Sequence, residues 1–480
     1  MSITGAMNAA ISGMRAAARG SEIVSNNISN ALTPSYGKRG LELSALSYGA
    51  TGGVRIDGIT RHMNEGVAAD RRLADAAQQN TQAAVSFFRQ LEDIAGLAGG
   101  SSGLGGRLAA FEESLITAAS RPDAVERLGN TVTNAQWLVD GIGNAARDIQ
   151  EMRTRADTEI AQDVQTLNTA LQQVEQLNAQ INTTRSRNGD SPALLDQRQA
   201  VLDTIGAIVP INVVPRDNGT VAIYSEGGAV LLDITAAEIG FEQQNIVTEF
   251  QTVDAGTLSG LTLNGQDVRT SALGGGRLGG NFAVRDTYSV QAQAQLDALA
   301  RDLVERFADP AVDPTRGAGD PGLFTDAGAA FDPLNEVGLS TRLSLNAAVD
   351  PEVGGEVTRL RDGLGAVVAG PAGDATLLNS LRTALDTARA PASGGFGTGA
   401  RSAADLFSSF SSALATTRSN AEQDLSFSSA RLTELTGLQM SEGVDTDQEL
   451  QNLLLIERAY AANARVIQAA DAMLETLTRL

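Results

Sequence analysis

The chain has 480 residues, more than one hydrophobic core usually spans, so two or three domains are expected. Its net charge of −21 argues against nucleic-acid binding and disfavours anionic membranes, because both partners need basic patches. It contains no cysteine, which excludes disulfides, thiolate metal sites and cysteine nucleophiles. No segment approaches the roughly 18 apolar residues of a membrane span. The N-terminus lacks the basic region of a Sec-type signal peptide.

The first segment, residues 3–28, is predicted to form one amphipathic helix. Its seam positions are spaced by alternating fours and threes, the heptad pattern of a coiled coil. The helix should end between Asn30 and Pro34, because proline lacks an N–H donor and restricts the residue before it. The seam positions are Ile3, Met7, Ala10, Met14, Ala17, Ser21, Val24 and Ile28.

The last segment shows the same heptad spacing after a break at Gly443. Thr446 and Glu449 have the spacing of a capping box at its start. Either helix alone would fit an ordinary core helix. A seam at both ends favours helices that seek partners, because undocked chain ends usually fray. The C-terminal seam positions are Leu453, Ile456, Tyr460, Asn463, Ile467, Ala470, Leu474 and Leu477.

The middle of the chain is predicted to be helical on both sides of a β-rich insertion. At Ile208 the apolar period changes from 3.6 to 2, and Asp217-Asn218-Gly219 is typical of a hairpin turn. The expected helices cover 107–186, 191–205, 285–307, 377–388 and 402–438. The expected strands cover 211–214, 221–224 and 230–234, with short strands near 246–253 and 261–268.

These patterns predict an α+β fold that is mainly α. It would have terminal coiled-coil-like helices, an elongated helical domain and an inserted β-rich domain. The boundaries are 1–45 and 440–480 for the terminal helical assembly domain, 46–207, 285–335 and 372–439 for the helical domain, and 208–284 for the β-rich domain, with 336–371 unassigned.

Motif-like strings do not support catalysis. Residues 99–103 fit G-x-S-x-G, but that motif needs a histidine after the serine, and the only histidine, His62, precedes it. Ser35 and Lys38 fit S-x-x-K, but the chain has no second lysine for a K-T-G partner. His62 alone cannot form a metal site. We therefore expect no enzymatic activity, cofactor or metal.

Residues 23–39 read IVSNNISNALTPSYGKR. This string closely resembles the N-terminal signature of the bacterial flagellar rod, hook and hook-associated axial proteins, in which Asn-Asn-Ile-x-Asn-Ala is followed by Thr-Pro-Gly-Tyr and a basic residue. Leu32 replaces a usual polar residue, and Gly37 follows Tyr36 instead of preceding it. Residues 444–477 resemble the terminal helix of the same family. Within the family, 194–198 and 275–279 resemble the hook-associated member at the junction of hook and filament.

The resemblance implies a structural junction subunit that polymerises through its terminal helices. It implies as partners hook protein, the next hook-associated protein, a cytoplasmic export chaperone and the flagellar type III export apparatus. The location would be the extracellular flagellum, reached without a cleavable signal peptide. The alternatives are a hook or distal-rod subunit, or a non-flagellar cytoplasmic scaffold whose ends form an intramolecular coiled coil.

The expected assembly residues lie on the two terminal segments. They are Ile3, Met7, Met14, Val24, Asn26, Asn27, Ile28, Asn30, Pro34 and Tyr36 in the N-terminal segment, and Leu453, Ile456, Tyr460, Asn463, Ile467, Leu474 and Leu477 in the C-terminal helix.

Overall fold

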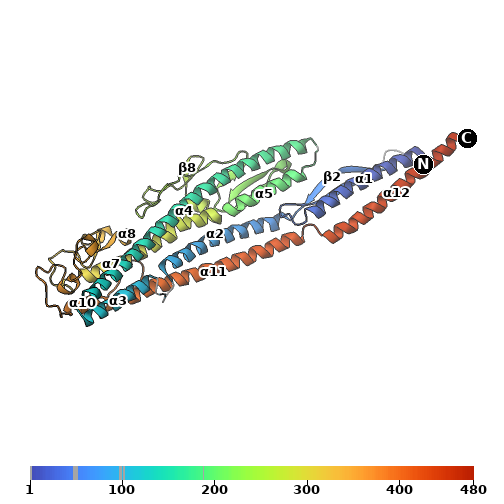
Figure 1. Ribbon diagram of the computed structural model, residues 1–480. Helices are drawn as coiled ribbons and strands as arrows, with labels where there is room; N and C mark the ends of the chain where they lie inside the picture. The colour runs from blue at the N-terminus through green and yellow to red at the C-terminus, as the bar shows by residue number, and fades with distance from the viewer. Residues whose placement is uncertain (1–2, 47–51, 97–99, 101–102, 188, 480) are drawn as a thin grey trace.

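The computed structural model describes residues 3–46, 52–96, 100, 103–187 and 189–479. The molecule is an elongated array of long helices with both chain ends at one tip (Figure 1). Helices dominate, and the sheets are small and antiparallel, which confirms the predicted α+β, mainly α fold class. Residues 99, 101 and 102 of the serine motif lie outside the described residues.

The tip that carries the chain ends consists of two paired helices and a hairpin. Helix α1 (Ile3–Ser29) lies beside α12 (Thr446–Arg479) (Figure 1). Strands β1 (Lys38–Ala45) and β2 (Val54–His62) form an antiparallel hairpin that contacts α1. The helices were predicted. The hairpin was not, because charged side chains interrupt the apolar alternation of both strands.

Long helices form the body. Helix α2 (Glu65–Ala95) lies along α11 (Ala403–Ser441), which begins with a capping box between Ser402 and Asp405. The main hydrophobic core joins these helices to the others of the body, and Phe111, Leu138 and Phe307 are among its fully buried members. The remaining long helices are α3 (Leu104–Ser120), α4 (Val125–Ser186), α7 (Ser289–Ala308) and α10 (Thr376–Asp386).

A β-rich region packs on the second half of α4 and has its own core. Its first sheet has the order β3-β4-β5, and the predicted turn is present, with Asn218 and Gly219 both at positive φ. The core combines these strands with one face of α4 and α5. The elements are α5 (Pro192–Ile208), β3 (Ile211–Pro215), β4 (Val221–Ser225), β5 (Val230–Leu232), β6 (Ile239–Gly240), β7 (Leu261–Leu263), β8 (Gln266–Val268) and α6 (Gly276–Ala283).

The predicted strand over 246–253 is wrong. The segment is a loop in which Ile246 and Phe250 are exposed and only Val247 inserts into the interior. The buried Arg153 of α4 donates to its carbonyls, with 2.9 Å to Thr248 O and 2.8 Å to Gln251 O. These bonds satisfy two of the carbonyl groups that a strand ladder would otherwise have paired.

The far tip holds short elements around residues 309–375. The unassigned segment 336–371 contributes two short helices and a strand to it. The elements are β9 (Phe324–Asp326), α8 (Leu339–Arg342), β10 (Leu343–Leu345) and α9 (Arg359–Asp362). One π-helical turn, Val284–Tyr288, precedes α7. The 3₁₀ turns are Asp217–Gly219, Thr270–Ala272, Pro333–Asn335 and Pro351–Val353.

Candidate assembly surface

Small residues let the two terminal helices approach closely. A Cβ added to Gly13 would meet the Asn463 amide at 2.6 Å, and one added to Gly20 would meet Ile456 Cδ1 at 3.1 Å. Glycine therefore provides the space that Asn463 and Ile456 occupy, since a larger side chain would push the helices apart. The buried residues of α1 are Gly5, Ala10, Ala16, Ala17, Gly20, Ile23, Val24 and Asn27.

The predicted N-terminal residues are distributed around this contact. Val24 and Asn27 are buried, while Pro34 is exposed on the turn after the helix. The others are half-buried: Ile3, Met7, Met14, Asn26, Ile28, Asn30 and Tyr36. The seam of α1 thus packs against α12 of the same chain.

The predicted C-terminal residues divide between two environments. Asn463 and Ile456 contact α1, and both are half-buried together with Leu453 and Ile467. Tyr460, Leu474 and Leu477 are exposed. The heptad pattern therefore marks residues on both sides of the helix.

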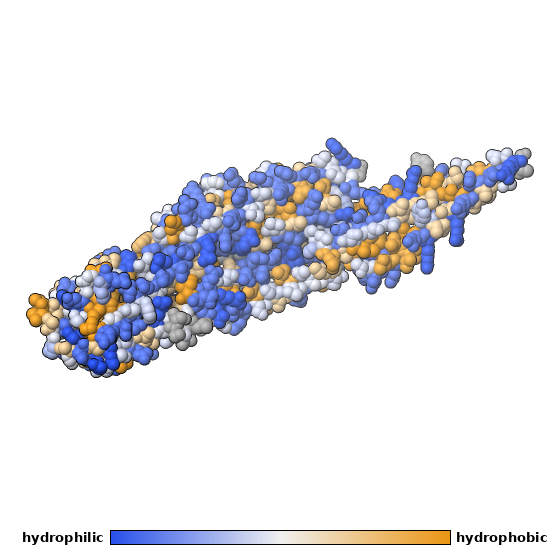
Figure 2. All heavy atoms as spheres, viewed as in Figure 1, coloured by the Kyte–Doolittle hydropathy of each residue, from blue (hydrophilic) through white to orange (hydrophobic). Residues whose placement is uncertain are grey.

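Most of α12 is open to solvent. Among residues 446–479, all of which the structure describes, only Glu449 and Ala470 are buried. Figure 2 shows apolar surface gathered along the paired terminal helices. We call the exposed large apolar residues of this helix the outer face of α12. They are Leu450, Leu454, Leu455, Tyr460, Val466, Met473, Leu474 and Leu477.

Sequence reasoning missed five residues of this face: Leu450, Leu454, Leu455, Val466 and Met473. The run Leu453-Leu454-Leu455 could have revealed this face in the sequence. Three consecutive leucines on a helix cannot all lie on one narrow seam, so some of them must lie outside it.

The asparagine motif forms the joint between the terminal helices and the hairpin. Asn27 Nδ2 donates to Arg39 O at 2.9 Å and to Glu449 Oε2 at 3.0 Å. Its Oδ1 accepts from Tyr36 Oη at 2.8 Å and from Arg39 N at 2.9 Å. Both ends of the buried amide are used, so Asn27 connects α1, the hairpin and α12.

Charge reinforces this joint. Lys38 Nζ lies 3.3 Å from the buried Glu449 Oε1 and donates to Gln448 Oε1 at 2.9 Å. Burial raises the pKa of Tyr36, although the Arg39 guanidinium 4.9 Å from its ring centroid opposes the shift. The phenol therefore stays protonated at neutral pH and can donate to Asn27.

A second cluster fixes the hairpin to the body through Asp196 of α5. Asp196 Oδ1 accepts from Gly37 N at 3.0 Å and from Arg61 Nε at 2.8 Å, and Oδ2 accepts from Arg39 Nη2 at 2.9 Å. One carboxylate thus binds both strands and the turn before them.

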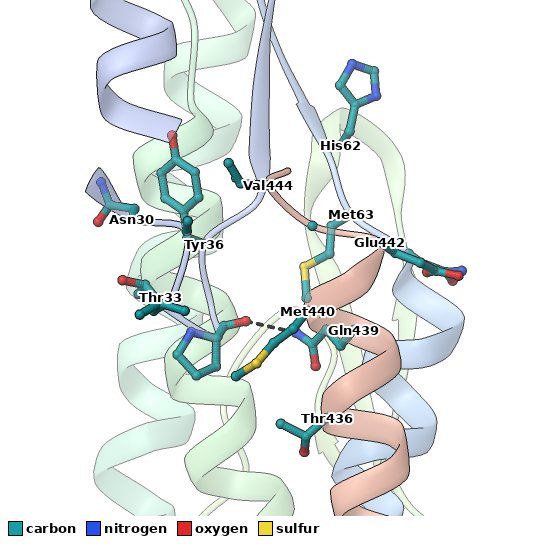
Figure 3. A pocket seen from close by; sticks show the side chains of 15 residues that line it. Asn30, Thr33, Tyr36, His62, Met63, Thr436, Gln439, Met440, Glu442 and Val444 are labelled. Atoms are coloured by element: carbon teal, nitrogen blue, oxygen red, sulfur yellow. Dashed lines mark hydrogen bonds between the residues drawn. The ribbon is translucent and has the colours of Figure 1, made fainter. Parts of the chain in front are cut away.

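A cavity lies beside the joint, between the 30–36 turn and the end of α11 (Figure 3). Gln439 Nε2 crosses it to donate to Pro34 O at 2.8 Å. Its labelled lining residues include His62, Met63 and Met440. No group of three or more potential metal ligands occurs in the described part of the chain. No helix there is long and apolar enough to cross a membrane.

Comparisons with known proteins agree with this architecture. Residues 88–311 match the family model "flagellar hook-associated protein FlgK helical domain", and residues 439–480 match "flagellar basal body rod FlgEFG protein C-terminal". The chain is 26% identical to flagellar hook-associated protein 1 of Escherichia coli (strain K12) over 551 aligned residues, covering 99% of both chains. It is 27% identical to the protein of that name from Salmonella typhimurium over 320 residues, covering 61% of this chain and 57% of the relative.

The chain is also similar to the solved flagellar hook junction protein FlgK from Burkholderia pseudomallei. The identity is 22% and the TM-score is 0.45, over 54% of this chain and 46% of that one.

The paired terminal helices, with a rod-type C-terminal segment on an extended helical body, define a flagellar axial protein. Because the helical domain matches and one relative aligns over nearly the whole chain, the chain belongs to the family of flagellar hook-associated protein 1. This confirms the resemblance read from residues 23–39 and 444–477. The family consists of structural flagellar components that assemble with other axial proteins.

Proposed function

We propose that this chain is the hook–filament junction subunit of the flagellum and that it polymerises through α1 and α12. The observation that carries the proposal is the outer face of α12, a set of exposed apolar side chains along a helix that also packs against α1. Contiguous apolar surface of this kind marks a protein–protein interface. In the assembled junction, this face packs against neighbouring subunits.

The pairing of the two ends within one chain was expected of the cytoplasmic scaffold alternative. Here it leaves large apolar side chains of α12 exposed, whereas a self-contained coiled coil buries its apolar seam and presents polar residues to solvent. A hook or distal-rod subunit is not favoured either, because the helical domain that matches residues 88–311 is that of the hook-associated protein.

The partners follow from the same surface. Hook protein and the next hook-associated protein contact the subunit from opposite sides of the junction. Before export through the flagellar type III apparatus, without a cleavable signal peptide, a cytoplasmic chaperone covers the apolar C-terminal helix. The subunit acts mechanically and has no catalytic role, cofactor or metal.

Truncation tests the assembly role of the terminal helices. No described residue of α1 or α12 belongs to either hydrophobic core cluster. A chain that lacks 450–480 should therefore keep the cooperative unfolding of its body but fail to enter the junction. Incorporation is measured by detecting the protein in sheared, purified hook–filament material from cells without the native copy. Loss of all cooperative unfolding would identify the terminal helices as core elements, and normal incorporation of the truncated chain would refute the proposal.

A further inference from the structure

A second cavity lies where the hairpin, the body and the β-rich region meet. It measures about 380 Å³, within the range of small-ligand sites. Its wall comes from the end of β2, the start of α2, the end of α4, α5 and the β3–β4 hairpin. Elements distant in sequence thus enclose one space.

The cavity is basic although the chain is strongly acidic. Five arginines line it, and Glu65 is the only carboxylate in the lining. Two of the five have close carboxylate partners: Arg61 Nε lies 2.8 Å from Asp196, and Arg216 Nη2 lies 3.3 Å from Asp233. The other three are Arg72, Arg185 and Arg198.

These three arginines lack adequate counter-charges. Within the described part of the chain, neither Arg185 nor Arg198 has a carboxylate at ion-pair distance. Arg198, with an exposed fraction of 9%, donates Nη1 only to neutral oxygens, at 3.0 Å to Asn178 Oδ1 and 2.6 Å to Gly219 O. Burial of a charge without a paired counter-charge is costly.

Arg72 is buried more deeply, with an exposed fraction of 5%. Its Nε and Nη1 have no hydrogen-bond partner, and its nearest carboxylate, Asp203, lies 3.6 Å from Nη1. Asp203 also pairs with Arg71 at 2.5 Å, so one carboxylate serves two guanidinium groups. The protein therefore buries N–H donors of Arg72 for which its own side chains provide no acceptor.

Electrostatics agrees with this geometry. Burial, together with the neighbouring charges of Arg61 and Arg185, lowers the pKa of Arg198 to about 10, although the Glu65 carboxylate opposes the shift. The guanidinium groups thus repel one another across the cavity. An anion between them would remove that repulsion and bond to the unused donors.

We propose that this cavity is a binding site for a small multivalent oxyanion, such as phosphate, sulfate or a polycarboxylate, held by Arg72, Arg185 and Arg198. A free anion fits better than an acidic segment of another chain, because elements of this chain surround the cavity on several sides. Gly219, at φ +77°, leaves the room that the Arg185 guanidinium occupies beside the cavity. A bound anion would fasten the hairpin, the body and the β-rich region to one another.

The test is titration of the full-length subunit with inorganic phosphate at constant ionic strength, with sodium chloride as the balancing salt. Calorimetry should show saturable binding, and the thermal midpoint should rise with phosphate but not with chloride. Arg185→Gln should weaken phosphate affinity about tenfold or more, because one charged donor is lost. Arg187→Gln is the matched control, since Arg187 is exposed and lies outside the cavity lining.

Arg198→Gln should abolish binding, but it also removes bonds to Asn178 and Gly219 that the fold uses. Because Arg185 is exposed, the Arg185→Gln variant should fold, and it therefore tests the proposal even if the Arg198→Gln variant does not fold. The proposal is overturned if phosphate has no more effect than chloride, or if Arg185→Gln and Arg187→Gln bind phosphate equally well.

Discussion

At the scale of single residues, Asn27 shows why an amide is needed at the joint. It donates to the Arg39 carbonyl and to Glu449, and it accepts from the Tyr36 hydroxyl and the Arg39 amide. A carboxylate of the same shape could accept but not donate, and it would lie beside Glu449. The site thus requires a side chain that both donates and accepts hydrogen bonds, and the position of Asn27 in the motif alone does not reveal this.

Asn27→Asp should therefore loosen the joint. We expect a loss of about 1–3 kcal/mol in the free energy of unfolding, because two buried hydrogen bonds lose their donor. Hydrogen exchange should increase in α1, β1 and the first turn of α12. Asn26→Asp, whose side chain makes no hydrogen bond among the described residues, is the control. Adding Glu449→Gln to Asn27→Asp should restore part of the loss, and no rescue would contradict the assigned contact.

Glu112 of α3 gives a pH dependence at the same scale. Burial raises its pKa, and the neighbouring Asp386 of α10 raises it further. The folded protein therefore holds this proton more tightly than the unfolded chain, so the stability contribution falls as pH rises above about 4.5 through the raised pKa.

Glu112→Gln should remove that fall. At neutral pH the variant should be more stable than the parent, by less than about 1 kcal/mol because solvent still screens this half-buried group. Thermal unfolding between about pH 4 and pH 7, a range that spans the titration of a carboxyl group, measures the difference. Glu113→Gln serves as the exposed control. An unchanged pH profile in Glu112→Gln would refute the assigned repulsion.

At the scale of elements, we propose that α12 has two faces with separate roles. Ile456 and Asn463 contact α1, whereas the side chains of the outer face are exposed to solvent. Leu454→Asp should therefore change the stability of the isolated subunit by no more than about 0.5 kcal/mol, as is usual for exposed positions. In the junction, a carboxylate buried against apolar neighbours would block incorporation.

Incorporation of Leu454→Asp is measured in sheared hook–filament material, with motility as a second reading. Leu334→Asp is a matched control, because Leu334 has an exposed fraction of 91% and belongs to the far tip. Normal junctions containing Leu454→Asp would show that the outer face is not an interface.

Local patterns in the sequence predicted the long helices other than α2 and the hairpin turn at residues 217–219, because each depends on neighbouring residues; the helix at Glu65–Ala95 was not predicted. They did not predict the β1–β2 hairpin, in which Lys38, Arg39 and Arg61 find their carboxylate partners on the distant helices α5 and α12. They also missed the arginine cavity, whose lining spans residues 61–221. Three-dimensional proximity of this kind leaves no periodic signal along the chain.

At the scale of the whole molecule, the structure separates a terminal unit from a body with its own cores. The terminal helices lie at one tip, and the far tip carries the short elements of residues 309–375 (Figure 1). The joint at Asn27 and Asp196 connects the two. The surface that we propose for polymerisation and the hydrophobic cores that stabilise the body thus lie in different parts of the chain.

The most direct test of this division is cysteine labelling. Because the chain has no cysteine, Leu455→Cys on the outer face and Val367→Cys at the far tip each introduce a unique thiol. Maleimide should label both variants rapidly in isolated subunits. In purified hook–filament junctions, Leu455→Cys should be protected while Val367→Cys still reacts. Equal labelling of Leu455→Cys in subunits and in assembled junctions would contradict polymerisation through α12.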